Sequence, residues 1–178
     1  MPRVAQGEVR ALNAGQIGSF NMVLISNTTK QKVKLAPLQN LAEEFLRVYK
    51  KSQREVSIVL LGAVAMRRLN RESRGIDRAT DVLSFGAPAK WPKNLTAQSL
   101  GEVIINLDEI KKTELYQDLF AEPKTPAYIL QFILVHGLLH LAGYDDRTAS
   151  ERRVMLKLGK RFLERRERVR RRKELFVV

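Results

Sequence analysis

A long apolar stretch in the last third of the chain, AYILQFILVHGLLHLA (Ala127 to Ala142), restricts the possible folds more than any other feature. It follows Pro123 and Pro126, which favour a helix start, and it is too short to span a membrane. A helix that is apolar on nearly every side must be covered by other elements. These residues are therefore expected to form a central, buried helix.

Apolar periodicity predicts further strands and helices on both sides of this stretch. The expected strands cover residues 22–29, 55–62, 80–86 and 101–110, the last of which runs into a short helix at 107–113. The other helices expected around this stretch cover 35–51, 63–73 and the chain from 149 onward. Residues 87–98, with two prolines and the only tryptophan, are expected to form a loop. Since strands and helices do not alternate strictly, the pattern indicates an α+β or mixed α/β fold with a small sheet.

Length and composition limit the class of protein further. The chain has 178 residues, of which 44% are hydrophobic, and this fits one domain with a real core better than two. It has no cysteine, so disulfides, iron–sulfur clusters and thiolate metal sites are excluded. There is no membrane-spanning run and no signal peptide, so a cytoplasmic location is expected. Residues 1–20 show no clear period and are expected to be a disordered extension.

The charge is strongly positive and concentrated towards the C-terminus. Lys and Arg number 32 against 19 Asp and Glu, which gives a net charge of +13. The segment from Glu151 to Val178 holds 12 of these cations and only 4 acids, and residues 164–178 are expected to form a basic helical tail. Such a surface favours polyanions, with nucleic acid first and anionic membrane second. For the tail alone, a solvated helix is the alternative.

The end of the apolar stretch reads HGLLHLAGYDD and contains the only two histidines, His136 and His140. Residues four apart share one helix face, so both imidazoles can reach one ion. Gly143 is a natural left-handed helix terminator, after which Asp145 or Asp146 can return over the same face. Two imidazoles and a carboxylate form an accepted zinc set with open positions, and the set also suits nickel or, less well, manganese. The alternative is a chance pair of buried histidines with other partners.

The residue after the first histidine limits the chemistry of such a site. Zinc proteases carry H-E-x-x-H, in which the glutamate is the general base. Here that position is Gly137, so peptide hydrolysis is disfavoured. A metal site on a basic protein instead favours the phosphodiesters of nucleic acid as substrate.

Three ordered motifs carry a resemblance to a known family. HGLLHLAGYDD resembles the signature H-G-x-L-H-L-x-G-Y-D-H of the YbeY family, bacterial metal-dependent endoribonucleases of rRNA maturation. The segments LNRESRGIDRATDVLSF (69–85) and LGEVIINLDEI (100–110) are similar to two further family segments, and Glu151 and Met155 match a closing E-x-x-x-M. The resemblance implies the YbeY-type α+β fold, in which a small mixed sheet is flanked by helices. Its catalytic domain would cover residues 21–163, with the metal helix over a cleft.

The resemblance also implies a set of site residues. His136 and His140 would hold one Zn²⁺, or nickel or another divalent ion, with Asp146 standing where the family has its third histidine. Arg74 matches the arginine of the family's cleft and would clamp phosphate as a catalytic residue. Residues expected to touch substrate, orient a ligand or only fix local structure are Glu102, Thr80, Asp81, Ser84 and Asp145.

The function implied is a single-strand-selective, metal-dependent endoribonuclease in rRNA maturation and ribosome quality control. Its expected partners are rRNA, the small ribosomal subunit and assembly factors, and no membrane. The alternative is a non-catalytic, RNA-binding ribosome-assembly factor whose metal site has degraded. Bound metal and cleavage that a chelator abolishes would distinguish the enzyme from the assembly factor.

Overall fold

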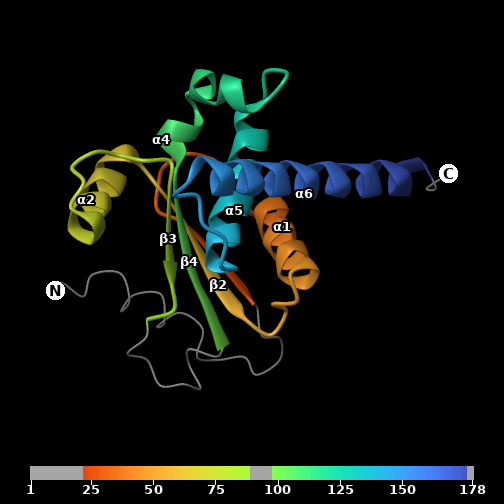
Figure 1. The fold of residues 1–178 in the computed structure, drawn as a ribbon, viewed down its shortest axis with the longest axis horizontal. Coiled ribbons are helices and arrows are strands. Elements are labelled where there is room, and N and C mark those ends of the chain that lie inside the picture. Colours follow the sequence, from red (N-terminus) through yellow and green to blue (C-terminus); the bar gives the residue numbers. More distant parts are fainter. Residues whose placement is uncertain (1–21, 89–97, 176–178) are drawn as a thin grey trace.

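The computed structural model describes residues 22–88 and 98–175 (Figure 1). The expected extension at 1–20 and residues 89–97 of the expected loop lie outside the described residues. The strands are β1 (Val23–Asn27), β2 (Glu55–Leu61), β3 (Val82–Gly86) and β4 (Ser99–Asn106). The helices are α1 (Leu35–Val48), α2 (Ala63–Arg74), α4 (Leu107–Ile110), α5 (Pro126–Leu141) and α6 (Ala149–Leu175), with the 3-10 helix η2 (Thr113–Leu119). Apart from η2, each of these elements corresponds to one expected from the sequence.

The four strands form one mixed sheet in the order β1-β2-β4-β3. β1, β2 and β4 run parallel, whereas β3 pairs antiparallel with β4. A small mixed sheet with helices around it confirms the expected α+β class. In Figure 1 the sheet is seen nearly edge-on, with α2 on one side and α5 and α1 on the other.

Side chains alternate between the two faces of the sheet, as in any strand. On β2, Val56, Ile58 and Leu60 belong to the main core together with α1, α5 and the buried residues of α6. Leu61 and its neighbour Val59 belong to a smaller cluster with α2 on the opposite face. The face on which a strand residue lies therefore decides whether it can approach α5.

The apolar helix is central, as the sequence predicts. α5 packs against the sheet, α1 and α6, and its buried residues are Ile129, Leu130, Phe132, Ile133, Leu134, Val135, Gly137, Leu138 and Leu139. Thr125 caps its start by accepting a hydrogen bond from the Tyr128 amide at 3.2 Å, with Pro126 in the first turn. No helix in the described ranges is both long and apolar enough to cross a bilayer.

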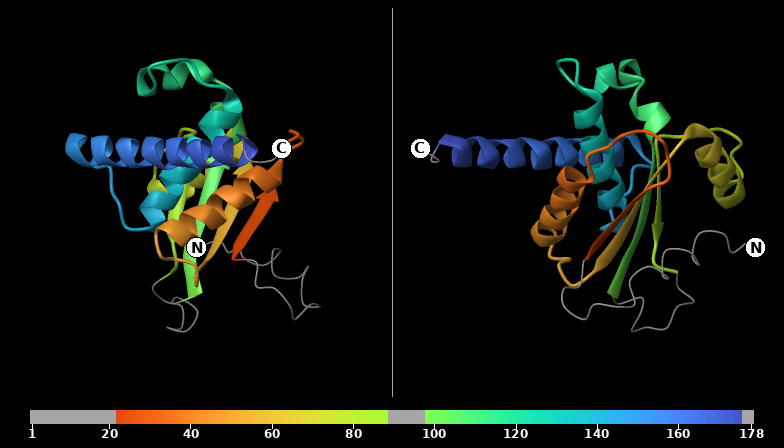
Figure 2. Two further views of the ribbon diagram at one scale, coloured as in Figure 1. Left: turned by 90° about the vertical axis from the view of Figure 1, so that its right-hand side faces the viewer. Right: turned by 180° about the vertical axis from the view of Figure 1, so that it is seen from behind.

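The last helix continues without a break well past the core. Met155, Phe162 and Leu163 of α6 are buried, and Arg166 binds Glu44 of α1 at 3.0 Å. Beyond this ion pair α6 projects past α1, as Figure 1 and the right-hand view of Figure 2 show. Its exposed surface there is mostly cationic, with Arg168, Arg170, Arg171 and Arg172.

Candidate metal centre

The end of α5 reverses the chain as predicted from Gly143. This residue has φ +103°, in the left-handed region that glycine adopts without strain. Its amide donates to the His140 carbonyl at 3.0 Å, and the Tyr144 amide donates to the Leu139 carbonyl at 3.1 Å. This pair of bonds is the Schellman motif. The chain then turns back, so that Asp146 approaches the face of α5 that carries the histidines.

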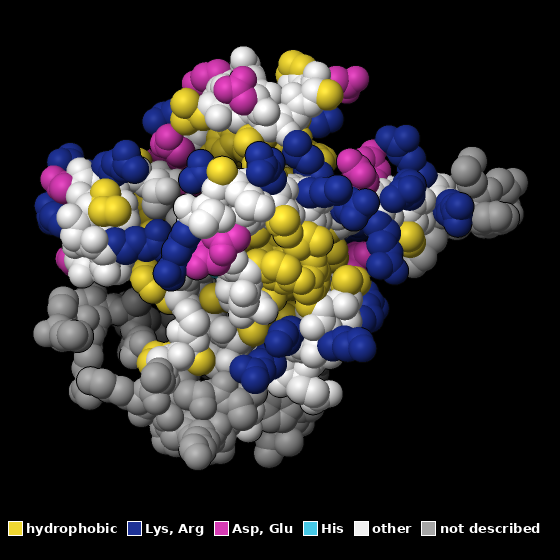
Figure 3. All heavy atoms as spheres, in the orientation of Figure 1, with side chains coloured by type: hydrophobic (Ala, Val, Ile, Leu, Met, Phe, Trp, Pro, Cys, Tyr) yellow, Lys and Arg dark blue, Asp and Glu magenta, His cyan; other side chains and the backbone are white. Residues whose placement is uncertain are grey.

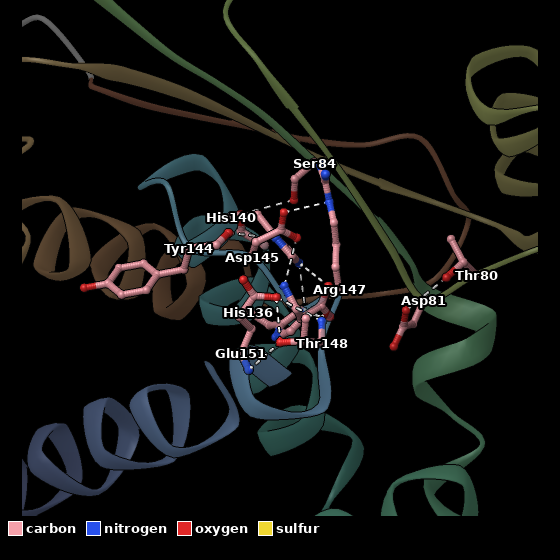
Figure 4. Close-up of polar contacts among 12 residues, drawn as sticks. Thr80, Asp81, Ser84, His136, His140, Tyr144, Asp145, Arg147, Thr148 and Glu151 are labelled. Carbon is pink, nitrogen blue, oxygen red and sulfur yellow. Dashed lines mark hydrogen bonds and ion pairs between the residues drawn. The ribbon is translucent and has the colours of Figure 1, made fainter. Parts of the chain in front are cut away.

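His136, His140 and Asp146 come together at the end of α5, and Figure 4 shows the two histidines there. The two Nε2 atoms lie 3.2 Å apart. Asp146 places Oδ2 at 3.4 Å from His136 Nε2 and Oδ1 at 3.8 Å from His140 Nε2. One ligand atom from each residue lies within 4.8 Å of the others, and all three residues are half-buried. In the parts of the chain that the structure describes, this is the one group of three or more such residues with metal-binding spacing.

These distances fit a divalent metal ion. Two nitrogen ligands at about 2.0–2.1 Å from a tetrahedral zinc ion lie about 3.3 Å apart, close to the separation of the two imidazoles. The two Nε2 atoms face each other. A pair of neutral imidazoles supplies one donor and one acceptor for this contact. The donor set of two nitrogens and a carboxylate oxygen leaves room for water or substrate, as catalytic zinc sites require.

Hydrogen bonding and burial prepare the histidines as ligands. His140 Nδ1 lies 3.2 Å from the Tyr144 carbonyl, which can only accept, so Nδ1 carries the proton and Nε2 keeps its lone pair. Burial, and to a smaller extent the neighbouring His140, lower the pKa of His136, against the opposing effects of Asp146 and Asp81. A neutral imidazole is the form that binds a metal ion. The Nδ1 atom of His136 is buried without a hydrogen-bond partner among the described residues.

Gly137 explains why no glutamate follows the first histidine. A Cβ atom at this position would lie 2.6 Å from Val103 Cγ1, 3.1 Å from Ser84 Oγ and 3.3 Å from Val82 Cγ2. α5 therefore touches β3 and β4 so closely here that no side chain fits. The position that holds the general base of zinc proteases is occupied by the sheet, which agrees with the inference against peptide hydrolysis. The sequence shows the glycine but not the close contact that requires it.

The residues around the cluster mainly hold the backbone. Ser84 lies on the α5 side of the sheet and donates to the Gly137 carbonyl at 3.1 Å. Asp145 accepts from the Asp146 amide at 2.8 Å and pairs with Arg147 at 2.8 Å, so its carboxylate supports the turn. Thr148, which follows this turn, begins a capping box for α6.

In this capping box, Thr148 Oγ1 accepts from the Glu151 amide at 3.2 Å, and Glu151 accepts from the Thr148 amide at 2.9 Å. The residues T-A-S-E carry the signal for it, although the expectations above drew only on Glu151 and Met155. The capping box fixes the start of α6, and its capping residue lies two positions after Asp146.

Thr80 and Asp81 lie apart from the histidines, in the turn before β3 (Figure 4). Asp81 accepts hydrogen bonds from the Val82 amide at 2.8 Å and, through its other oxygen, from the Tyr116 hydroxyl at 3.4 Å. The buried Asn106 binds both backbone carbonyls of this pair. Asp81 still acts on the site through its charge, which partly opposes the lowering of the His136 pKa by burial. Tyr116 of η2 was not expected from the sequence, because η2 has no clear apolar period.

Glu102 does not reach the cluster. It lies on the same face of β4 as Ile104, which belongs to the smaller hydrophobic cluster with α2. Val103 lies on the opposite face, which packs against α5. Its carboxylate accepts from the Ser57 hydroxyl at 3.2 Å. Burial raises the pKa of Glu102, against the smaller lowering effect of this hydrogen bond. The expectation that Glu102 could orient a ligand histidine is therefore corrected: the sheet separates the two.

Arg74 ends α2 and is exposed. Two other arginines of this helix, Arg67 and Arg71, are engaged by Asp77, at 2.8 and 3.5 Å. Within the described ranges the side chain of Arg74 makes no hydrogen bond or ion pair, and no contact joins it to the histidines. Its guanidinium is thus available to an external anion.

Fold and cluster together define an α+β protein with a metal-type site of two helical histidines and a carboxylate from the following loop. The family profile described as "Endoribonuclease YbeY" matches residues 24–167. A protein of that name from Azorhizobium caulinodans is 39% identical over 113 residues, covering 59% of this chain and 67% of the relative. One from Limosilactobacillus fermentum is 34% identical over 145 residues, covering 74% of this chain and 89% of the relative. The chain belongs to the YbeY family.

Comparison with solved structures agrees with this assignment. A solution structure of a protein from Thermotoga maritima aligns with a TM-score of 0.51 and 26% sequence identity. The alignment covers 80% of this chain and 87% of the other. The family resemblance drawn from the three sequence motifs is thereby confirmed.

Proposed function

We propose that this protein is a metal-dependent endoribonuclease that cleaves single-stranded RNA and acts in rRNA maturation and ribosome quality control. The observation that carries the proposal is the convergence of His136, His140 and Asp146 within 4.8 Å, in a chain of the YbeY family. The net charge of +13 supports RNA as the substrate. Its partners would be the small ribosomal subunit and assembly factors, and its place of action the cytoplasm.

The three ligands would hold one divalent ion, with zinc the best match to the donor set. When bound, such an ion supplies Lewis acidity and activates water for attack. The protein's own contribution is to fix the donors. The Tyr144 carbonyl sets the tautomer of His140, burial lowers the pKa of His136 and so favours its neutral form, and the turn held by Asp145 presents Asp146.

Arg74 is proposed to bind the phosphate under attack. A guanidinium can donate two parallel hydrogen bonds to phosphate oxygens, and it stabilises the negative charge that increases during cleavage. The exposed and unpaired state of Arg74 supports this role, since Asp77 engages the arginines beside it. No glutamate is available after His136 to act as a general base. The RNA 2′-hydroxyl therefore remains an alternative nucleophile to water.

The test is cleavage of a 5′-labelled RNA that contains single-stranded and duplex segments. Untagged protein should cut the single-stranded segment, lose activity with a chelator, and recover it with added Zn²⁺. The variant His140→Ala should be inactive, and Leu115→Ala, an exposed substitution on η2, should match the wild type. RNA binding without bound metal or cleavage would instead identify a non-catalytic assembly factor, and the enzymatic proposal would be wrong.

A further inference from the structure

Two tyrosines beside the metal centre, the exposed Tyr144 and the half-buried Tyr49, form an aromatic surface that the proposed mechanism does not use. Tyr144 follows Gly143 in the loop after α5, and it is 38% exposed. Its ring and that of Tyr49, at the end of α1, meet edge to face with centroids 6.2 Å apart. Figure 4 shows the Tyr144 ring directed away from the histidines, while its backbone carbonyl contacts His140. The residue that carries this ring therefore also contacts the metal centre, through its backbone carbonyl.

The surrounding core holds these rings in place. Tyr49 stacks on the buried Phe45, with centroids 4.2 Å apart and planes 17° apart, and lies 6.5 Å from Phe162 of α6. The Schellman motif fixes the backbone of Tyr144. An exposed ring with a fixed orientation loses little conformational entropy when a flat ligand stacks on it.

Three cations lie close in sequence to the rings of this cluster. Lys50 follows Tyr49 directly, and Arg161 and Arg165 lie one residue before and three residues after Phe162 on α6. All three cations are exposed, and none of them makes a side-chain hydrogen bond or ion pair with another residue in the described part of the chain. Figure 3 shows exposed hydrophobic side chains gathered below α6, with Lys and Arg both above and below them. An aromatic surface between unpaired cations is what proteins use to bind single-stranded nucleic acid, because bases stack on the rings while phosphates meet the cations.

We propose that Tyr144 and Tyr49 form a base-stacking platform for single-stranded RNA, with Lys50, Arg161 and Arg165 binding its phosphates. The platform would hold a nucleotide close to the one cleaved at the metal centre, and in this respect the inference rests on the proposed function. Duplex RNA cannot use it, because its bases are already stacked and paired. Tyr144 is therefore a positioning residue for the substrate.

The experiment measures binding of a fluorescein-labelled single-stranded RNA to the full chain by anisotropy, without added metal. Tyr144→Leu keeps an apolar side chain but removes the ring, and it should weaken binding between about 5-fold and 100-fold. Tyr144→Phe keeps the ring and should bind like the wild type. Leu115→Ala, an exposed apolar substitution on η2, is the control for general surface effects.

A second series locates the stacked base. In RNAs with one base at a time replaced by an abasic site, the wild type should lose affinity at one or two positions, and Tyr144→Leu should lose no further affinity there. Equal RNA affinity of Tyr144→Leu and wild type would overturn the platform and assign this surface to a protein partner. If that result accompanies normal cleavage, the proposed enzyme stands without the platform. If binding depends on Tyr144 but no RNA is cleaved, the platform stands and the enzymatic function fails.

Discussion

Replacing Gly137 by Ala tests the packing that holds the metal helix against the sheet. The added Cβ would lie 2.6 Å from Val103 Cγ1, with two further contacts below 3.4 Å. Overpacking of a close-packed core costs about 1–3 kcal/mol, whereas Gly to Ala inside a helix gains about 1 kcal/mol. Since three neighbours would have to move, and two of them are β-branched valines with restricted rotamers, the cost lies towards the upper limit. We expect a net loss of about 1–2 kcal/mol in the free energy of unfolding.

Gly159→Ala is the matched control. Gly159 is a buried glycine in α6, but its nearest neighbour is the edge of the Phe132 ring at 3.1 Å, with the next atom at 3.6 Å. Both variants gain the same helix propensity, so the difference between them isolates the steric cost at Gly137. Urea unfolding followed by circular dichroism gives each midpoint, and an unchanged m-value shows that the unfolded state is the same. Equal midpoints for Gly137→Ala and Gly159→Ala would refute the argument that α5 needs a glycine there.

Arg74→Ala should reduce RNA cleavage strongly without changing stability or metal content. Arg74→Lys should recover only part of the rate, because the point charge of an ammonium group cannot replace the planar guanidinium. Normal turnover of the Ala variant would reject the role of Arg74 in binding phosphate. The raised pKa of Glu102 means that the folded state binds its proton more tightly than the unfolded state. Stability should therefore fall as pH rises above about 4.5, the ordinary pKa of a glutamate, and Glu102→Gln should flatten this fall, as read from urea midpoints at increasing pH. Deleting residues 168–178 should leave the metal content unchanged but weaken the salt dependence of RNA binding. The slope of log affinity for RNA against log salt concentration should decrease in magnitude by about 0.7 for each RNA phosphate that this segment neutralises. An unchanged slope would mean that this end of α6 does not touch RNA.

Local features of the fold could be predicted from the sequence. α5 was predicted because its residues are apolar around the whole helix, and its end was predicted because Gly143 supplies a conformation that other residues adopt with strain. Histidines four apart on a helix share a face whatever the tertiary structure is. The sequence therefore indicated the candidate metal site before any fold was known.

Other parts of the site depend on tertiary contacts and could not be predicted. Alternation along β4 places Glu102 opposite to Val103, but only the packing of α5 and α2 decides which of them faces the histidines. The need for a glycine at position 137 arises from Val103, Ser84 and Val82, which belong to other elements. The contact between Tyr49 and Tyr144 joins residues from two distant parts of the chain, so no local pattern indicates it.

The proposed function depends on the binding of one metal ion by His136, His140 and Asp146. The most direct measurement is elemental analysis of protein purified without a histidine tag, compared with His140→Ala, Asp146→Ala and Asp146→His. We predict about one equivalent of zinc or another divalent metal in the wild type. His140→Ala should lose the metal, and Asp146→Ala should contain clearly less of it. Asp146→His should retain the metal fully, because a third histidine is also a zinc ligand. Wild-type protein without metal after incubation with Zn²⁺, or equal metal content in Asp146→Ala and wild type, would contradict this assignment of the ligands.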